Sequence, residues 1–597
     1  MFSYTNKFLD VNLTHGKIET KNLDEKTAEK FVGGKGLGAK ILYDSLKKNT
    51  NPLSPENIII FATGPLTGTL APSSARWCVV TKSPLTNIFL DSQVGGSFGV
   101  KMKKAGYDII IVRGKSSSPV YLNVTDENSE IVDAENLWGK GCFYTEKTLK
   151  KELGKNISVA SIGNAGEKLV RYACISTDMY RQAGRGGAGA VMGSKNLKAV
   201  AVKGNKKIDY AEPEKFKENV KKAFKNVKEH HFTPLRSRYG TPVWVNPVNE
   251  GGLLPTRNFQ KGVFEHADEI SGEKMKETIV VKDESCPGCP IKCWKHSKSK
   301  NNNYSFEVVG PEYETIALIG SNNMIRSIKA IALANQLCDD FGLDTISTGD
   351  VIAFASECSE KGLIKENIGF GDEEKLIELI KKIGKREDIG DLLAEGVKRI
   401  SEKIGGKDFA MHVKGMEIPG YDPRGAFGMA LAYATSDRGG CHQRAWTVRA
   451  ELQGNLKPAY STEGRARFVK DGQDSNAMLF SLVLCDFMPL GAEDYIELLN
   501  SAAGFDFTIE EYMKTGECIW NLTRMFNIRE GITRKDDTLP PRFMNEVLPD
   551  GPAKGQKITK EILDKMLDEY YSLRGWDENG IPRKEKLEEL GLGETVV

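Results

Sequence analysis

The segment Ala199-Val-Ala-Val-Lys-Gly204, followed by Glu214-Lys-Phe-Lys-Glu-Asn-Val-Lys-Lys-Ala-Phe-Lys-Asn-Val-Lys228, marks the place where the pattern of the chain changes. The first part is a short apolar run that ends at a glycine, which is typical of a buried strand. The second part repeats its apolar residues at helical spacing. The sequence therefore predicts that strands give way to helices at about residue 210.

The sequence patterns on the two sides of this boundary differ along the whole chain. Before it, short apolar runs bounded by Gly, Pro or Ser begin at Asn57, Trp77, Ile109 and Val120, with one helix expected over residues 24–46. After it, helical spacing dominates, over residues 214–228, 328–341, 373–383, 389–404 and 559–571.

This pattern predicts an α+β fold, in which a β-rich N-terminal domain is the base for a cofactor and two mainly α-helical domains follow. We place the domains at residues 1–208, 209–417 and 418–597. The second domain then carries three clustered cysteines, and the third carries a further candidate cysteine.

The composition of the chain argues against several classes of protein. The chain has 597 residues and a formal net charge of +2, which argues against a nucleic-acid-binding protein. Its N-terminus lacks the pattern of a secretory signal, and no stretch approaches the roughly 18 apolar residues of a membrane span. We therefore expect a cytoplasmic protein without a membrane partner. Eleven cysteines, an odd number, argue against a disulfide framework there.

The sharpest local motif is Cys286-Pro-Gly-Cys289-Pro-Ile-Lys-Cys293. Three thiolates at this spacing can bind one compact metal centre. One interpretation is a zinc site closed by His296. The other is a [4Fe–4S] cluster with a distant fourth cysteine. Spacing alone does not separate them.

Three glycine-rich stretches lie in the first domain, over residues 33–39, 94–99 and 183–195. The first contains G-x-G-x-x-A but follows a helical segment, so it fails the context of a dinucleotide fingerprint. The third ends in Gly-Ser-Lys and is not a Walker A loop. Glycines let backbone N–H groups approach an anion closely. Together with Arg76 and Arg185, the three stretches favour a large ligand with several phosphates.

At this point the chain resembles a known family, the tungsten-containing aldehyde ferredoxin oxidoreductases. The resemblance runs nearly from end to end. It is carried by ordered motifs at residues 33–38, 64–69 with Arg76, 183–198, 254–259, the cysteine cluster, 310–315, 339–344, 420–425, 438–442 and 570–577.

The resemblance implies a tungsten (or molybdenum) bis-pterin, one [4Fe–4S] cluster and a Mg²⁺ ion that bridges the pterin phosphates. The cluster ligands would be Cys286, Cys289, Cys293 and Cys485, which leaves His296 without a metal. Arg76 would lie between pterin and cluster, and the backbone carbonyls of Gln93 and Ala183 would hold Mg²⁺. The positions that match cofactor contacts are Arg76, Gln93, Gly95, Gly96, Ala183, Gly184, Arg185, Gly186, Asp339, Gly342, Leu343, Asp344, Arg444 and Leu484.

Two departures from the family pattern stand out. The family pairs two D-x-x-G-L-[D/C] motifs. The first is present at residues 339–344, but the second has Phe480 in place of Asp and Val483 in place of Gly. Recognition of one pterin must therefore differ. A Glu-x-x-His pair is also missing from residues 328–337, which predicts a homodimer without a bridging metal, or a hetero-oligomer.

The resemblance implies oxidation of aldehydes to carboxylic acids, with electrons passing through the cluster to ferredoxin or a ferredoxin-like subunit. Glu314 would accept a proton and His442 would donate to the aldehyde oxygen, while Tyr313 and Tyr421 add O–H groups or shape the pocket. Two alternatives are a tungsten subunit of a multi-subunit complex, such as an aromatic acyl-CoA reductase, and a zinc-stapled scaffold. The sequence does not define the aldehyde, the direction of the reaction or W against Mo.

Overall fold

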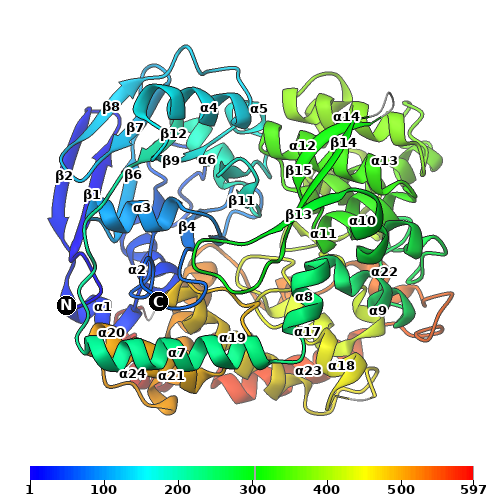
Figure 1. The fold of residues 1–597 in the computed structure, drawn as a ribbon. Coiled ribbons are helices and arrows are strands. Elements are labelled where there is room, and N and C mark those ends of the chain that lie inside the picture. Colours follow the sequence, from blue (N-terminus) through cyan, green and yellow to red (C-terminus); the bar gives the residue numbers. More distant parts are fainter. Residues whose placement is uncertain (301–303, 457, 596–597) are drawn as a thin grey trace.

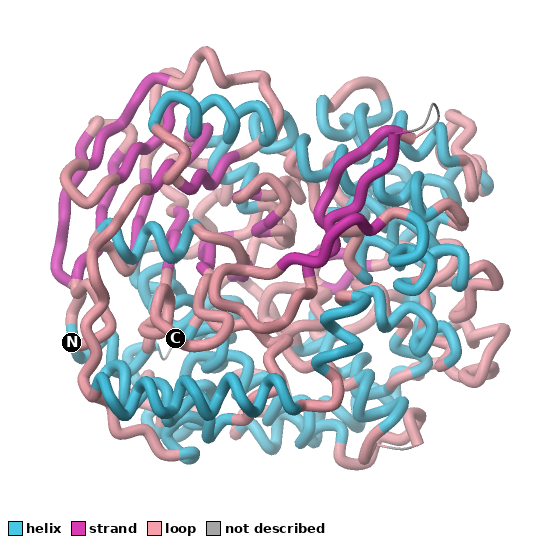
Figure 2. The backbone as a smooth tube through the Cα atoms, in the orientation of Figure 1, coloured by secondary structure: helices cyan, strands magenta, loops and turns pink. Residues whose placement is uncertain are grey.

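The computed structural model describes residues 1–300, 304–456 and 458–595. A β-sheet region at the N-terminus is followed by a mostly helical remainder, which confirms the predicted α+β class. Figure 1 shows the two sheets of the N-terminal region on one side of the molecule and the helical segments beside and below them. Figure 2 shows the same division by secondary structure.

The N-terminal region holds two six-stranded mixed sheets. The first has the order β2 (Lys17–Asn22), β1 (Lys7–Asn12), β6 (Ile109–Arg113), β3 (Ile59–Ala62), β4 (Trp77–Lys82) and β5 (Phe89–Val94). The second has the order β11 (Arg181–Ala183), β10 (Ile175–Thr177), β9 (Ser158–Ser161), β12 (Leu197–Val202), β7 (Val120–Val124) and β8 (Ser129–Asp133).

Six helices accompany these sheets: α1 (Glu25–Phe31), α2 (Gly34–Ser45), α3 (Phe98–Ala105), α4 (Cys142–Leu153), α5 (Asn164–Glu167) and α6 (Ala188–Ser194). Helices α3 and α6 contact strands of both sheets and therefore lie between them. Helix α2 packs on β3 and β4 of the first sheet.

The central part of the chain is helical apart from two small sheets. Its helices are α7 (Pro213–Glu229), α8 (Thr233–Tyr239), α9 (Val245–Glu250), α10 (Gly272–Thr278), α11 (Tyr313–Thr315), α12 (Ile328–Phe341), α13 (Thr345–Glu360), α14 (Glu373–Lys385), α15 (Ile389–Leu393) and α16 (Val397–Ile404). Its strands are β13 (Val280–Glu284), β14 (Trp294–Lys300), β15 (Ser305–Val309), β16 (His412–Val413) and β17 (Met416–Glu417).

The last part of the chain is helical and packs back on the first. Its helices are α17 (Phe427–Thr435), α18 (Val448–Gln453), α19 (Arg465–Leu482), α20 (Ala492–Ala503), α21 (Ile509–Arg529), α22 (Pro541–Asn545), α23 (Lys560–Arg574) and α24 (Lys584–Glu589). Helices α19 and α21 contact α2, so the two ends of the chain share one core.

The predicted strands are found at β3, β4, β6, β7 and β12, but two predicted helices are each broken in two. The helix expected over residues 24–46 stops at Val32, which has a φ of 62°, and restarts at Gly34. The helix expected over residues 389–404 breaks at Gly396, which has a φ of 84°. Apolar periodicity continues through both breaks, and it is backbone conformation that ends the helices.

The glycine-rich stretch at residues 33–38 is a packing site, which corrects its proposed part in phosphate binding. A Cβ on Gly33 would lie 2.7 Å from the carbonyl oxygen of Ser481, and a Cβ on Gly34 would clash with Cγ2 of Val483. A larger residue has no room here because the end of α19 lies directly against this turn. These glycines therefore serve helix contact.

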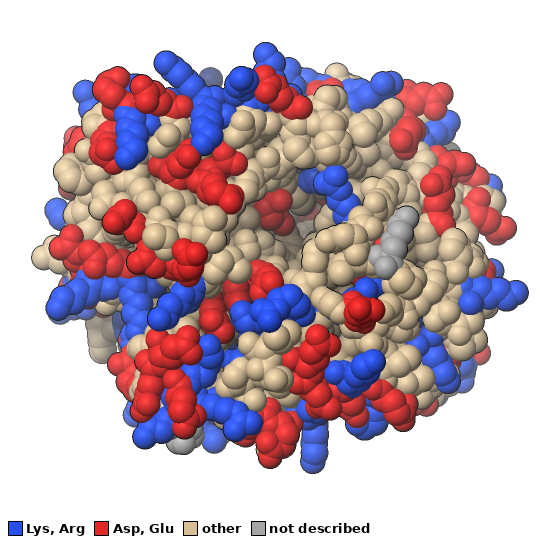
Figure 3. Space-filling view, turned by 90° about the horizontal axis from the view of Figure 1, so that it is seen from below, with Lys and Arg blue, Asp and Glu red and all other residues tan. Residues whose placement is uncertain are grey.

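No helix in the described part of the chain is long and apolar enough to cross a membrane. Figure 3 shows one face of the molecule, hollowed near its centre, with Lys, Arg, Asp and Glu interspersed over it.

Candidate active site

A cavity of about 1070 Å³ lies between the N-terminal sheets and the helical remainder. Its wall combines the ends of β5 and β11, helices α8 and α11, the C-terminal end of α12, and the loops that follow α17 and α19. This volume is in the upper range of ligand sites in proteins. Residues far apart in the sequence therefore meet around one large ligand-sized space.

The predicted cluster cysteines all line this cavity. Three of them lie on the loop between β13 and β14, and the fourth follows α19. They are Cys286, Cys289, Cys293 and Cys485. The last three pack against Val227, Ile291 and Met488. A Cβ on Gly95 would lie 3.0 Å from the Cys286 sulfur, so a backbone turn of the N-terminal sheet borders the group.

The zinc interpretation does not fit this arrangement. The His296 ring lies on β14 with Nε2 3.0 Å from Glu307 Oε1 and Nδ1 3.6 Å from Glu284 Oε2. Over residues 1–300, 304–456 and 458–595, no three His, Cys, Asp or Glu side chains form a set that fits a single metal ion. The four free thiols line one cavity, and thiolates are the ligands that iron–sulfur clusters use.

Arg76 lines the cavity beside Cys485. Its Nη1 donates to the Cys485 sulfur at 3.5 Å, and its Nε has no hydrogen-bond partner. Burial opposes the charge of Arg76, but the neighbouring Cys485 and Asp486 raise its pKa above the usual value. A fixed cation here suits an anionic cluster on one side and an anionic cofactor on the other.

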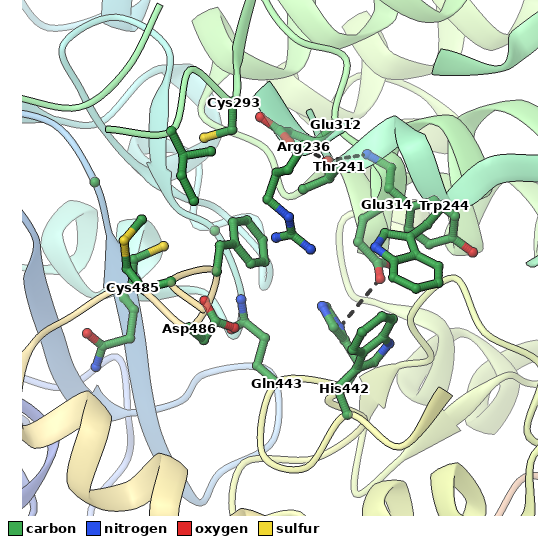
Figure 4. Close-up of a pocket in the computed structure, with 18 of the residues that line it drawn as sticks. Arg236, Thr241, Trp244, Cys293, Glu312, Glu314, His442, Gln443, Cys485 and Asp486 are labelled. Carbon is green, nitrogen blue, oxygen red and sulfur yellow. Dashed lines mark hydrogen bonds and ion pairs between the residues drawn. The ribbon is translucent and has the colours of Figure 1, made fainter. Parts of the chain in front are cut away.

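Glu314 and His442 face each other at the opposite end of the cavity. Glu314 lies on α11, which continues into a π-helical turn over Ile316–Gly320, a feature frequent at functional sites. Its Oε2 accepts from the Gly420 N–H at 2.8 Å, and its Oε1 lies 3.5 Å from His442 Nδ1. Figure 4 shows the two side chains directed toward one another across this end of the cavity.

The environment sets the protonation of this pair. Burial raises the pKa of Glu314 to about 7, which the Gly420 N–H and the charge of Arg185 counter only in part. Burial, followed by the charges of Arg185 and Arg438, lowers the pKa of His442 to about 3. At neutral pH the imidazole is therefore uncharged, and Glu314 is poised to take up or release a proton.

The two predicted tyrosines also meet at this end. The Tyr313 and Tyr421 rings stack with centroids 4.9 Å apart, and the Tyr421 ring lies 5.7 Å from that of His442. However, the Tyr313 hydroxyl donates to the Gly420 carbonyl oxygen. Tyr313 therefore shapes the pocket and is not free to donate to a substrate.

The two remaining glycine-rich loops border the cavity at its sheet side. Gln93, Gly95, Gly184 and Arg185 line it, and a Cβ on Gly184 would meet no atom closer than 3.9 Å, so this backbone is open to a ligand. The Arg185 guanidinium is already occupied, since it bonds Asp344 and the carbonyls of Gly440 and Glu417. The backbone N–H groups of this loop are therefore available to bind phosphate, whereas the Arg185 guanidinium is already engaged.

The end of α12 contributes Asp339, Leu343 and Asp344 to the cavity wall. Asp339 accepts from Gln182 and Asn335, both at 3.0 Å, and burial raises its pKa to about 8. Several predicted cofactor contacts are not among the residues that line the cavity, although some of them, such as Ala183, adjoin lining residues in the sequence. They are Gly96, Ala183, Gly186, Gly342, Arg444 and Leu484.

Arg444 belongs to a buried ion cluster that supports the wall. Its Nε lies 2.9 Å from Asp437 Oδ1, and its Nη2 bonds Asp91. Lys35, from the first glycine-rich stretch, bonds both aspartates. Although burial alone would raise it, the pKa of Asp437 is lowered by Arg444 and Lys35. The cluster thus joins the loop that carries His442 to the N-terminal sheet.

Unpaired polar atoms gather around the cavity, which is the expected mark of a site built for a large polar ligand. Buried atoms without a hydrogen-bond partner include Gln93 Oε1, Arg76 Nε, Gln182 Oε1, Glu314 Oε1, His442 Nδ1, and Nε and Nη1 of Arg236. Together with the four thiols, they fit a pterin-type cofactor and a metal–sulfur cluster.

Sequence reasoning missed the aromatic part of the wall. The missed residues include Phe232, Arg236, Thr241, Trp244, Trp446, Asp486 and Phe487. Phe232, Arg236 and Trp244 come from the short helices that follow α7, where no motif marks them. Aromatic residues near a cysteine motif were the one available signal.

Residues 8–204 match the family model for the aldehyde ferredoxin oxidoreductase N-terminal domain, and residues 218–592 match the model for domains 2 and 3. The chain belongs to the aldehyde ferredoxin oxidoreductase family. The family resemblance seen in the sequence is thereby confirmed, and with it an oxidoreductase of a tungsten-containing family.

Relatives of this family match over the whole chain. A tungsten-containing aldehyde ferredoxin oxidoreductase of Pyrococcus abyssi is 45% identical, with 100% of both chains covered. An aliphatic sulfonate oxidoreductase, WOR-like subunit, of Pyrococcus furiosus is 36% identical over 100% of this chain and 98% of its own. Among solved structures, the active site complex BamBC of benzoyl coenzyme A reductase has a TM-score of 0.86 and 28% identity, covering 100% of this chain and 98% of that chain.

Proposed function

We propose that this enzyme oxidises an aldehyde to a carboxylic acid and passes the electrons through a [4Fe–4S] cluster to ferredoxin or a ferredoxin-like subunit. The observation that carries the proposal is the layout of one cavity. The Glu314–His442 pair lies at one end and the four cysteines lie at the other, with Arg76 beside them. The reaction consumes one aldehyde and one water, and yields one carboxylic acid, two protons and two electrons.

The cofactors follow from the residues that would hold them. Bound in the cavity, a tungsten–pterin group supplies the two-electron redox chemistry. Backbone N–H groups near Gly95 and Gly184 would bind its phosphates, Asp339 and Asp344 its pterin rings, and the carbonyls of Gln93 and Ala183 a bridging Mg²⁺ ion. The cysteines would hold the cluster, and each thiolate is favoured once the cluster's cations counter the effect of burial.

The protein's own part in catalysis is proton transfer and orientation. Glu314, with a pKa near neutrality, takes the proton released when water adds to the aldehyde carbon. His442 is neutral, so one of its ring nitrogens donates a hydrogen bond to the aldehyde oxygen, where negative charge develops. The Tyr421 ring lies beside the imidazole at a tilt of 53°.

Electron exit is supported by the position of the cysteine loop. Pro287 and Gly288, between the first two cysteines, are exposed, so an acceptor protein can approach the cluster closely. Cytoplasmic location, and assembly as a homodimer without a bridging metal or as a hetero-oligomer, complete the proposal.

The decisive experiment replaces Glu314 by Gln in enzyme purified without oxygen. We expect kcat with an aldehyde and a viologen dye to fall by roughly 100-fold or more, because the general base is removed. Tungsten, iron and pterin contents should remain at wild-type levels. Glu312→Gln is the matched control, since Glu312 lines the same cavity but bonds Thr241, and its kcat should change less than about threefold.

Wild-type activity in the Glu314→Gln variant would reject the assignment of the base. The similarity to BamBC provides a second candidate, a tungsten subunit of an aromatic acyl-CoA reductase complex. Turnover of benzoyl-CoA by the wild-type enzyme, with no turnover of free aldehydes, would favour that candidate and reject the main proposal.

A further inference from the structure

Arg236 is a buried cation without a protein partner. It lies on α8, its residue is 8% exposed, and it lines the cavity. Its Nε and Nη1 have no hydrogen-bond partner, and its guanidinium forms no ion pair among the described residues. Because burial of an unpaired charge is costly, such a group is expected to meet an anion when the site is occupied.

The other arginines of the cavity wall have protein partners. Arg76 donates to Cys485, Arg185 bonds Asp344 and two carbonyls, and Arg438 bonds Cys441 and the Asp91 carbonyl. Arg181 Nη1 lies 4.0 Å from Glu312 Oε1, although its Nε and Nη2 have no hydrogen-bond partner. Arg236 therefore stands out as the guanidinium left for a ligand.

Two aromatic rings hold Arg236 in place. Its Cζ lies 4.4 Å from the centroid of the Phe487 ring and 5.2 Å from that of Phe232. Stacking fixes the plane of the guanidinium while leaving its N–H edge free. A planar fork held in this way is suited to a carboxylate or a similar anion.

Arg236 points toward the catalytic end of the cavity. Figure 4 shows its guanidinium directed into the space between Asp486 and the Glu314–His442 pair. It is also close enough to Tyr421 to influence that side chain. Burial and Glu314 raise the pKa of Tyr421, and the charge of Arg236 partly lowers it. An anion bound here would therefore lie near the Tyr421 ring and the neighbouring His442 ring.

We propose that Arg236 binds an anionic group on the substrate, so that the preferred substrates are aldehydes with a carboxylate or similar anion at their other end. This inference rests on the proposed function and names the substrate class of the same site. The aldehyde carbon would be held near Glu314 and His442, while the distal anion pairs with Arg236 between Phe232 and Phe487.

The test compares succinic semialdehyde with its neutral amide, 4-oxobutanamide, in the holoenzyme. Arg236→Gln should lower kcat/KM for succinic semialdehyde by about 100-fold, as expected for loss of a buried charge pair. The value for the amide should change less than about threefold, and tungsten and iron contents should be unchanged. Arg236→Lys, which keeps the charge, should retain part of the preference. Arg449→Gln is the control, since Arg449 lies at the same wall but contacts His231.

Direct binding supplies a readout that does not depend on turnover. Calorimetry should detect succinate binding to wild-type holoenzyme and weaker binding to Arg236→Gln. Equal effects of Arg236→Gln on both aldehydes, or loss of tungsten from this variant, would overturn the inference about Arg236. Oxidation of aldehydes by the wild-type enzyme would still support the proposed function. If wild-type enzyme oxidises no aldehyde, the proposed function fails, and succinate binding still decides the role of Arg236.

Discussion

The C-terminal ends of α12 and α19 have the same backbone and different chemistry. Each helix ends in a left-handed residue, Gly342 with φ 74° and ψ 56°, and Val483 with φ 60° and ψ 46°. In each, the next residue donates back to the last turn, Leu343 to Cys338 at 2.8 Å and Leu484 to Leu479 at 3.3 Å. The two caps therefore direct the chain into the cavity region in the same way.

The side chains on either side of the cap residue differ between the two helices. Asp339 faces the cavity, whereas the equivalent Phe480 lies behind the wall, where the Arg444 guanidinium is 5.6 Å from its ring centroid. The second residue after the cap is an acid, Asp344, at the end of α12 and a thiol, Cys485, at the end of α19. These side chains suit the roles proposed above, binding of a polar ring at the α12 end and of a metal at the α19 end. The backbone geometry of the cap is thus the same in both helices, while the side chains that flank it differ in chemistry.

The largest effect is expected from removing the thiol of the α19 end. Cys485→Ser should lose most of the roughly four iron atoms per chain, because serine is a poor cluster ligand. Ferredoxin-coupled activity should be lost with them. Iron analysis and electron paramagnetic resonance of the reduced protein measure this.

Cys518→Ser is the matched control for this experiment. Cys518 is buried on α21 and bonds the Leu590 carbonyl, which a serine hydroxyl can also do. Iron content should stay at the wild-type level. Full iron in Cys485→Ser would remove the distinction between the two helix ends.

A smaller effect is expected from exchanging the cap residues. Gly342→Val should lower the free energy of unfolding by about 2–5 kcal/mol, through left-handed strain and contacts at 3.2 Å with Gly163 N and 3.3 Å with the Cys174 carbonyl. Val483→Gly relieves the same strain but loses a fully buried side chain, so the net loss should be about 1 kcal/mol. Urea unfolding measures both. Equal losses would mean that the caps tolerate valine alike.

The smallest effect concerns the acid of the α12 end. Its folded pKa of about 8 lies above the unfolded value, so between these values the unfolded chain binds fewer protons and stability falls as pH rises. In cofactor-free protein, Asp339→Asn should reduce the fall in unfolding midpoint from pH 5 to pH 8. Glu314, whose pKa burial also raises, contributes to the fall in the same direction. Asp340→Asn removes a charge that helps to raise the pKa of Asp339, but burial is the larger cause, so this variant should reduce the fall much less than Asp339→Asn does.

The sequence predicted those parts of the fold that depend on local pattern. The long helices α7 and α12 lie where their periodicity placed them, and the cysteines that the family resemblance grouped do line one cavity. Helix breaks at Val32 and Gly396 were missed because backbone conformation, and not apolar spacing, determines them.

Other parts of the site depend on contacts between distant segments and could not be predicted. Arg444 looked like a cofactor contact, but two aspartates hold it behind the wall. Arg236 carries no motif, and its lack of a partner is visible only when the whole cavity is assembled. The roles of the individual site residues remain predictions for the variants above.

The close contact of Gly33 with the Ser481 carbonyl has a consequence for maturation. It means that Cys485 reaches its working position only after the two ends of the polypeptide have docked. During synthesis, the three cysteines of the central loop emerge long before their fourth partner is seated. If the four cysteines bind the cluster as proposed, cluster loading is a late step, and a bulky residue at position 33 should produce iron-poor enzyme although it touches none of the four cysteines.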